Sequence, residues 1–218
     1  MKVELIAYTQ PAGKLLNTGI RGPKDLIAYC ARVSNPANQM NSETSNKLLL
    51  YLKKHKHWSP FEQVDVTLEV ESTRDIVRQM LRHRSFCFQE FSQRYADVEE
   101  LGTVFEFSEA RLQDTKNRQN SVAVEDPILQ EAWLKMQKQV AEVSFNAYKA
   151  ALDLGIAKEV ARKVLPEGLT KSRVFMKGSI RSWIHYLEVR GPGSGTQKEH
   201  ELVAAEIAKA ISEIFNIV

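Results

Sequence analysis

The sequence predicts an α+β protein, in which an antiparallel sheet is flanked by helices, including long amphipathic helices. Two observations predict this class. Few segments show strand alternation while many show helical spacing, and the two kinds do not alternate as regular βαβ units would. A length of 218 residues, of which 43% are hydrophobic, suits a single domain over residues 1–218 with a core of its own. The sequence contains no internal repeat.

Alternation of apolar and polar residues predicts the strands. It is strictest over residues 63–71, where every second residue is valine or leucine, and this is the clearest strand in the chain. A second alternation opens the chain at Val3, Leu5 and Ala7. Residues 172–177 form the third expected strand.

Apolar residues at helical spacing predict the helices. Ser72 or Thr73 is the expected N-cap of the third helix, Pro127 lies in the first turn of the longest, and Pro166 ends the fifth. The expected helices cover residues 24–33, 46–55, 73–84, 127–154, 157–164, 180–189 and 197–215. The expected loops are residues 34–42, the polar segment 111–126, which we expect to be mobile, and the GPGSG run at 191–195.

Composition argues against several classes of protein. The formal charge of +3, from 30 basic and 27 acidic residues, is too mild for a typical nucleic-acid-binding domain. Cys30 and Cys87 cannot form a disulfide framework, and no CxxC pair indicates a structural metal. No apolar run approaches the roughly 20 residues that span a bilayer, and the N-terminus does not resemble a signal peptide. We therefore expect a cytoplasmic protein with reduced thiols, no metal site and no membrane contact.

The most informative stretch is RHRSFCFQEFSQRY at residues 82–95. Its basic residues follow the third expected helix, on which Arg78, Gln79 and Arg82 share one face. Guanidinium groups bind phosphate through two parallel hydrogen bonds, and a carboxylate such as that of Glu90 can orient a hydroxyl or a base N–H. The stretch therefore predicts a site for an anionic ligand with several polar groups.

Two simpler interpretations of this stretch stay open at this point. Basic residues also favour helix C-termini, where they remain solvated, although the interleaved Phe86, Phe88 and Phe91 favour partial burial. The flanking phenylalanines also predict that Cys87 is a buried, inert thiol. Alternatively, a nucleic-acid-binding module could use the arginines as a track for phosphates, namely Arg74, Arg78, Arg82, Arg84 and Arg94.

Five segments, in order along the chain, resemble one enzyme family. RHR followed by seven residues and Ser, from Arg82 to Ser92, is similar to the signature of the flavin-dependent thymidylate synthases. The resemblance continues in ARVS at 31–34, in HKHWSPFE at 55–62, in EVARKVLP at 159–166 and in GSIRSWIHYLEVR at 178–190. It thus spans most of the chain.

The resemblance implies an enzyme that methylates dUMP, with FAD as cofactor and with NADPH and 5,10-methylenetetrahydrofolate as co-substrates. It also implies a homotetramer whose active sites are shared between subunits, with Ser34 reaching a neighbour's FAD. Arg190 is the implied catalytic residue, because its guanidinium would stabilise the anion that forms when uracil N3 ionises, without any cysteine nucleophile. An inactive relative that only binds flavin or nucleotide is an alternative.

The matching positions supply candidate site residues. For dUMP they are Gln79, Arg82, Glu90, Ser92, Gln93, Arg94, Arg162 and Arg190. For FAD they are Ser34, His57, Ser59, Glu62, Arg82, His83, Arg84, Gln89, Glu90, Ser179, Arg181 and His185. Neither a P-loop nor a GxGxxG motif is present, so these assignments depend on the family resemblance.

Three of these positions depart from the family pattern. Gln89 and Ser179 stand where Asn is commoner, and Gln93 stands where a small residue is usual. The longer side chain of Gln93 would crowd a backbone contact to the nucleotide. We expect altered affinity or loop geometry rather than loss of activity, because the arginines and Glu90 remain.

Overall fold

The centre of the molecule is an antiparallel sheet, as the sequence predicts. The computed structural model describes residues 1–215 of the chain. The sheet has four strands, and each runs antiparallel to its neighbour. Their order across the sheet is β1 (Lys2–Tyr8), β2 (Asp65–Thr73), β6 (Lys171–Ser179) and β3 (Cys87–Glu90). The α+β class is confirmed.

The helices lie close to where helical spacing predicts them. In the described part of the chain they are α1 (Gly22–Ala31), α2 (Ser45–Lys54), α3 (Arg74–Met80), α4 (Pro127–Asp153), α5 (Lys158–Ala161), α6 (Ile180–Arg190) and α7 (Lys198–Ser212). Short 3-10 helices are η1 (Gly13–Leu15), η2 (Pro36–Asn38), η3 (Ser59–Gln63), η4 (Val98–Leu101) and η5 (Arg162–Val164). Pro127 begins α4, and the Asp126 side chain caps it by accepting the N–H groups of residues 128 and 129.

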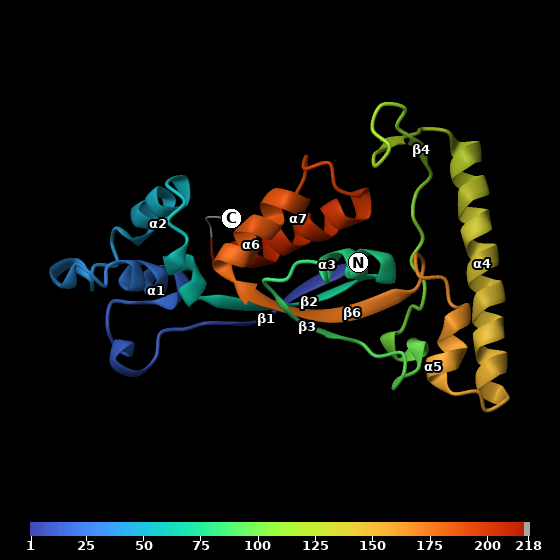
Figure 1. Ribbon diagram of the computed structural model, residues 1–218, viewed down its shortest axis with the longest axis horizontal. Coiled ribbons are helices and arrows are strands. Elements are labelled where there is room, and N and C mark those ends of the chain that lie inside the picture. Colours follow the sequence, from blue (N-terminus) through green and yellow to red (C-terminus); the bar gives the residue numbers. More distant parts are fainter. Residues whose placement is uncertain (216–218) are drawn as a thin grey trace.

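Alternation along β2 places the core on one face of the sheet. Val66, Leu68 and Val70 are fully buried there, whereas the residues between them are partly exposed. Helices α6 and α7 lie across this face (Figure 1). Trp183 of α6 is also fully buried and donates its indole N–H to the Val66 carbonyl at 3.2 Å. This contact fixes α6 on the sheet.

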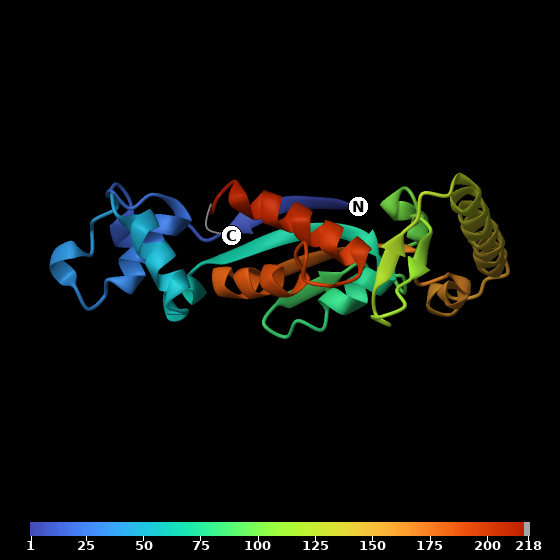
Figure 2. The same ribbon diagram turned by 90° about the horizontal axis from the view of Figure 1, so that it is seen from above.

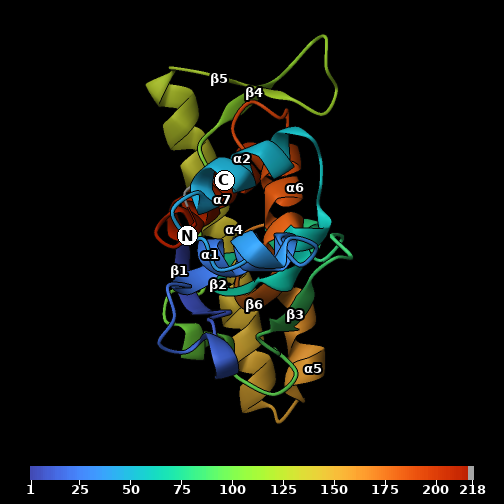
Figure 3. The same ribbon diagram turned by 90° about the vertical axis from the view of Figure 1, so that its left-hand side faces the viewer.

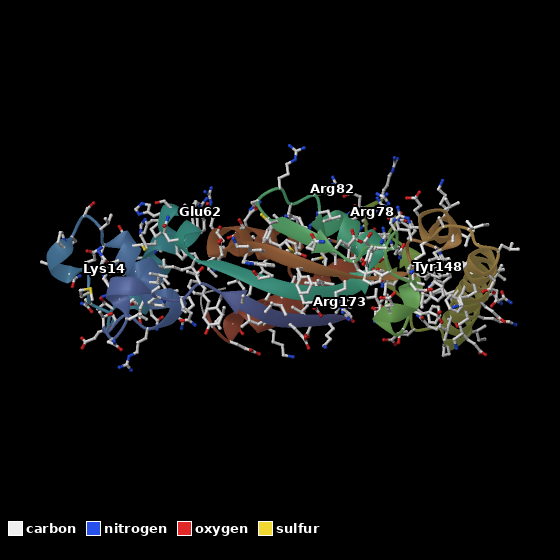
Figure 4. The ribbon with its side chains drawn as sticks, turned by 90° about the horizontal axis from the view of Figure 1, so that it is seen from below. Lys14, Glu62, Arg78, Arg82, Tyr148 and Arg173 are labelled. Atoms are coloured by element: carbon white, nitrogen blue, oxygen red, sulfur yellow. The ribbon has the colours of Figure 1, made fainter. Side chains whose placement is uncertain are left out.

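The opposite face of the sheet carries paired charges. Seen from below, the strands lie uncovered by helices along most of their length (Figure 4). Lys177 of β6 lies 2.8 Å from Asp65 of β2, and Arg173 lies 2.6 Å from Glu71. Such cross-strand pairs balance the charge of adjacent strands and keep the face polar.

The molecule is elongated, with helices at both ends of the sheet. Helices α1 and α2 form a lobe at one end, and α4 stands at the other (Figure 2). Viewed along this axis, the β4–β5 segment and α5 lie at opposite ends of α4 (Figure 3). Tyr148 of α4 is buried in a small cluster with Val98 and Ala161, separate from the main core. None of the helices in residues 1–215 is long and apolar enough to cross a membrane.

The structure corrects the prediction of a mobile loop at residues 111–126. This segment holds two short antiparallel strands, β4 (Arg111–Gln113) and β5 (Ser121–Ala123). The connecting turn is ordered by Asp114, whose carboxylate accepts the N–H groups of residues 116 and 117 and the amide of Asn120. Strands of three residues are too short to show a period-two pattern, which explains the error.

The structure also corrects the extent of the third helix. Helix α3 ends at Met80, four residues earlier than predicted, so Arg82, His83 and Arg84 lie in the turn before β3. Strand β3 was not predicted, and its pairing with β6 makes Cys87 exposed rather than buried. Alternation along the strand turns Cys87 to the face opposite Phe86 and Phe88.

Candidate active site

A large cavity lies between η3 and the N-terminal half of α6. It has a volume of about 600 Å³ and is lined by Lys56, Trp58, Glu62, Ser85, Arg181, Ser182, His185 and Glu188. Three of these, Glu62, Arg181 and His185, are predicted FAD residues. An indole surface beside two cationic side chains and two hydroxyl groups suits a flat aromatic ring that carries phosphates. The residues present therefore fit part of a flavin nucleotide.

Glu62 organises one wall of this cavity. Its Oε2 accepts the Ser179 hydroxyl at 2.5 Å, and its Oε1 accepts Arg181 Nη1 at 2.8 Å. Ser179 is also the N-cap of α6 and accepts the Ser182 N–H. Although Ser179 stands where the family has Asn, its side chain caps α6 and binds the Glu62 carboxylate.

The Arg82–Arg84 turn lies beside the same helix. Phe86 anchors it, because its ring is buried against Trp183 at a centroid distance of 4.6 Å. Ser182 Oγ donates to the Ser85 carbonyl at 3.3 Å, which ties α6 to the turn. Arg82 and Arg84 are exposed, and Arg82 lies along the same edge of the molecule as Glu62 (Figure 4). Partial burial of this stretch, which the phenylalanines predict, is observed for Phe86.

Arg190 and His83 form a pair at the other end of α6. Arg190 Nε donates to His83 Nε2 at 3.1 Å, and its Nη1 donates to Thr196 Oγ1 at 3.1 Å. Burial, together with the positive charge of Arg190, lowers the pKa of His83 to about 4. His83 is therefore neutral at pH 7 and accepts a hydrogen bond that a protonated imidazole could not accept.

A second cavity of about 450 Å³ lies over β3 and the turn that follows it. Its lining includes three predicted residues, Gln89, Glu90 and Ser92. Glu90 Oε1 accepts Ser172 Oγ at 2.8 Å and Arg74 Nη1 at 3.2 Å. The carboxylate is thus fixed from two elements, β6 and α3.

Two of the predicted dUMP residues, Arg94 and Arg162, are connected to α5. Arg94 Nε lies 3.1 Å from Glu159, and Lys158 Nζ donates to the Tyr95 carbonyl at 3.3 Å, so α5 contacts the turn that follows β3. Arg162 follows α5 directly and lies close enough to Arg74 to lower the pKa of Arg74, an effect secondary to burial. Of these cationic groups, Arg74 contacts Glu90 directly, and Arg162 lies near Arg74.

Ion pairs with carboxylates make the phosphate track discontinuous, although the Arg78 and Arg94 pairs are largely exposed. Of its five arginines, Arg74 pairs with Glu90, Arg78 with Glu167 and Arg94 with Glu159. Only Arg82 and Arg84 form no ion pair with the described residues. A nucleic-acid surface would instead present a continuous row of unpaired cations.

Gln93 has a buried side chain in the structure. It is 3% exposed, and its Nε2 has no hydrogen-bond partner among the described residues. An unpartnered buried amide is costly unless a further group accepts its hydrogen. The longer side chain at position 93 is therefore accommodated inside the protein, where its amide donor has no partner among the described residues.

Nine of the twelve predicted FAD residues do not line the large cavity, and three of them lie in the segment from α1 to η3. Ser34 is exposed in the turn after α1, while His57 and Ser59 are exposed beside the lining residues Lys56 and Trp58. The structure therefore brings Glu62, Ser179, Arg181 and His185 together but leaves Ser34 in the α1–α2 lobe.

Sequence reasoning missed several residues that shape the site. Arg74 and Ser172 hold Glu90, Thr196 holds Arg190, and Trp58 and Ser182 line the large cavity. Trp58 and Ser182 lie inside segments that resemble the family, so the motif could have signalled them. No local sequence pattern indicates that Thr196 contacts Arg190.

Comparison with known proteins shows similarity over nearly the full chain. A family model described as thymidylate synthase complementing protein matches residues 14–216. A probable flavin-dependent thymidylate synthase of Paramecium bursaria Chlorella virus 1 is 47% identical over 215 residues, which are 99% of this chain and 94% of the relative. A flavin-dependent thymidylate synthase of Synechocystis sp. is 48% identical over 215 residues, with the same coverage. Among solved structures, the UMP/dUMP methylase PolB from Streptomyces cacaoi, bound with 5-Br dUMP, has a TM-score of 0.81 at 27% identity and covers 98% of this chain and 90% of its own.

Proposed function

The chain belongs to the family of flavin-dependent thymidylate synthases, and we propose that it methylates dUMP with carbon from 5,10-methylenetetrahydrofolate and a hydride from NADPH. In the balanced reaction the uracil C5 proton leaves, the methylene carbon bonds to C5 while its two bonds to folate nitrogens break and those nitrogens take up protons, and the hydride reduces that carbon to methyl. The products are dTMP, tetrahydrofolate and NADP⁺. Bound FAD supplies the hydride relay between NADPH and the methylene carbon.

The arrangement of Arg190 is the observation that best supports this mechanism. Its guanidinium is held through Nε by neutral His83 and through Nη1 by Thr196. A guanidinium fixed in this way can stabilise negative charge at uracil N3 as C5 becomes nucleophilic. We therefore assign Arg190 as the catalytic residue.

The FAD site that we propose extends along the cavity between η3 and α6. Glu62 would orient Arg181 toward a phosphate, His185 would contact the flavin from the cavity wall, and Ser59 would contact it from beside the cavity. The full proposed set is Ser34, His57, Ser59, Glu62, Arg82, His83, Arg84, Gln89, Glu90, Ser179, Arg181 and His185. Helix α6 places Arg181 and Arg190 roughly 13 Å apart along its axis, so one helix would serve both cofactor and nucleotide.

For dUMP we propose the residues around Glu90 and the end of α3. They are Gln79, Arg82, Glu90, Ser92, Gln93, Arg94, Arg162 and Arg190. Arg94 and Arg162 would bind the phosphate, with Ser92 donating its hydroxyl to the same group. The Arg94–Glu159 pair is largely exposed, so the doubly charged phosphate can replace the carboxylate at little cost.

We propose a homotetramer of single-domain subunits, each folding over residues 1–218. Helix α4 supports association, because several large apolar side chains on it face solvent in one subunit, such as Ile128 at 80% and Val143 at 70% exposure. Ser34 is not among the residues that line the large cavity, which supports sites shared between subunits.

Tritium release from dUMP labelled at C5 tests the proposed reaction. With methylenetetrahydrofolate and NADPH, we expect release from the wild-type protein. Arg190→Ala should lower kcat at least about 100-fold, because a fixed donor to the developing charge is lost. FAD should remain bound, as judged by its visible absorbance.

The matched control is Arg118→Ala, which removes an exposed arginine in the β4–β5 turn. It should keep wild-type turnover. Full activity of Arg190→Ala would refute the role assigned to Arg190. Failure of the wild-type protein to bind added FAD would refute the proposed function itself.

A further inference from the structure

A buried histidine outside the motif residues contacts one predicted nucleotide ligand. His200 lies in the first turn of α7 and is 0% exposed. Its Nε2 lies 2.8 Å from the Tyr186 hydroxyl, and its Nδ1 lies 3.2 Å from Gln79 Oε1. The three residues come from α7, α6 and α3, so the contact joins three helices behind the proposed dUMP site.

The partners of Gln79 determine where the protons lie. Gln79 Nε2 donates to Gln197 Oε1 at 2.7 Å, so its other end, Oε1, is the acceptor that faces His200. His200 must therefore donate from Nδ1. A neutral imidazole carries one proton, which leaves Nε2 to accept the hydroxyl hydrogen of Tyr186.

The surroundings keep both groups in these protonation states. Burial lowers the pKa of His200 to about 3, with the charge of Arg190 acting in the same direction. Burial also raises the pKa of the Tyr186 phenol. The chain of hydrogen bonds thus runs in one direction, from Tyr186 through His200 to Gln79.

We propose that His200 is a positioning residue for nucleotide binding, which fixes the Gln79 amide with its carbonyl oxygen inward and its NH₂ group toward the ligand. The inference rests on the proposed function, in which Gln79 contacts dUMP. The Oε1 end is part-buried at His200, whereas the Nε2 end is exposed. The amide therefore offers a donor to an acceptor oxygen of the nucleotide.

Loss of the His200 donor would weaken this preference and leave Gln197 Oε1 as the one described partner that still favours it. The two ends of a glutamine amide have nearly the same shape, so only hydrogen bonding distinguishes the two orientations. In the flipped orientation the carbonyl oxygen would face an oxygen of dUMP, and the two acceptors would repel each other. The effect would appear in dUMP binding rather than in the chemical step.

A double-mutant cycle on the flavin-loaded enzyme tests the inference. Kd for dUMP is measured by calorimetry for the wild type, Gln79→Met, His200→Phe and the double variant. We expect His200→Phe and Gln79→Met each to weaken dUMP binding about tenfold, equivalent to about 1.4 kcal/mol. In the Gln79→Met background, His200→Phe should cause no further loss, because it acts only through that amide.

Val203→Ala is the matched control for a general effect of disturbing α7. Val203 is fully buried one turn after His200. This variant should lower Tm while leaving Kd for dUMP unchanged. KM for dUMP should rise in His200→Phe with kcat within about twofold of the wild type.

Two outcomes would overturn the inference. The first is that His200→Phe binds dUMP with wild-type affinity. The second is that His200→Phe weakens dUMP binding by the same factor in the wild-type and in the Gln79→Met background. If Gln79→Met itself binds dUMP normally, the contact assigned to Gln79 is wrong and the inference fails with it. Tritium release from these variants would still report on the proposed reaction, so the two failures are distinguishable.

A direct measurement on the unmodified enzyme covers the case in which His200→Phe does not fold. The chain has five histidines, so ¹⁵N-labelled histidine gives few signals, and His200→Asn assigns the relevant one. We expect His200 to carry its proton on Nδ1 at pH 7, and an Nε2–H form would overturn the inference. His200→Asn should also retain dUMP binding better than His200→Phe, because its amide can still donate to Gln79.

Discussion

His83 and His200 show how burial sets the chemistry of individual residues. Both histidines are adjacent to proposed nucleotide ligands, and each accepts a hydrogen bond through Nε2. A protonated imidazole has no lone pair to offer, so the Arg190–His83 contact exists only with a neutral ring, and Tyr186 can donate to His200 only when that ring is neutral. Desolvation favours the neutral ring, because the charged form loses its hydration.

These two residues predict how stability depends on pH. Their pKa values in the folded protein are about 4 for His83 and about 3 for His200, below the unfolded value of about 6.5. Below pH 6.5 the unfolded chain binds protons that the folded chain does not bind. Their contribution to the free energy of unfolding is therefore complete above pH 6.5 and is lost progressively as the pH falls toward 4 and then 3.

Urea denaturation between pH 7.5 and pH 4.5 checks this expectation. The wild type should lose stability across the range, and His200→Asn should lose less, because one of the two buried rings is gone. An identical pH slope in the two proteins would contradict the prediction. The comparison concerns slopes, so a uniform loss of stability in the variant does not affect it.

At the scale of elements, one helix and one turn organise the proposed site. The first turns of α6 carry Arg181 and His185 at the large cavity, and its last residue is Arg190. The turn that contains Arg82–Arg84 packs against the middle of the same helix through Phe86. The position of this ring therefore controls how the basic turn meets α6.

Gly178 of β6 makes room for the Phe86 ring. A Cβ at this position would lie 2.5 Å from Phe86 Cδ1 and Cε1, which is too close for any side chain. We expect Gly178→Ala to displace the ring and to lower the free energy of unfolding by about 1–3 kcal/mol. FAD affinity should fall as well, because the turn moves with the ring.

Gly168→Ala is the control, since a Cβ there meets nothing within 4 Å. Chemical denaturation measures the stability of both variants, and fluorescence titration measures FAD binding. Wild-type stability in Gly178→Ala would show that the Phe86 ring can adopt another packed position without loss of stability. That outcome would remove the argument that links Gly178 to the turn.

At the scale of the whole molecule, the elongated shape bears on the proposed tetramer. Ser34 lies in the α1–α2 lobe, whereas Arg190 lies at the end of α6 over the sheet (Figure 1). If Ser34 of one subunit completes a neighbour's site, each site takes its Ser34 and its Arg190 from two different subunits. A mixture of defective subunits can then rebuild intact sites.

Subunit mixing tests this arrangement. Ser34→Trp should block the FAD contact, and Arg190→Ala should remove the catalytic guanidinium, so each variant alone should be nearly inactive. After unfolding and refolding together in equal amounts, about a quarter of the sites should combine an intact Ser34 with an intact Arg190. The absence of recovered tritium release would contradict shared sites, provided that co-refolded wild type regains activity.

The sequence predicted most of the elements because their patterns are local. Period-two alternation identified β2, and helical spacing identified the long α4 with Pro127 in its first turn. Strand β3 and the β4–β5 pair were missed, since they are only four and three residues long. Their hydrogen bonds come from partner strands rather than from a pattern of their own.

The sequence by itself determined the α+β class and, through the ordered motifs from Ala31 to Arg190, the enzyme family. Only the tertiary structure decided how the motif residues are held. Arg190 and His83 meet across 107 positions of sequence, and His200 and Gln79 meet across 121. A motif records which residues are present, but hydrogen-bond partners and burial arise when distant segments pack together. That packing makes both histidines neutral and leaves the Gln93 amide without a partner among the described residues.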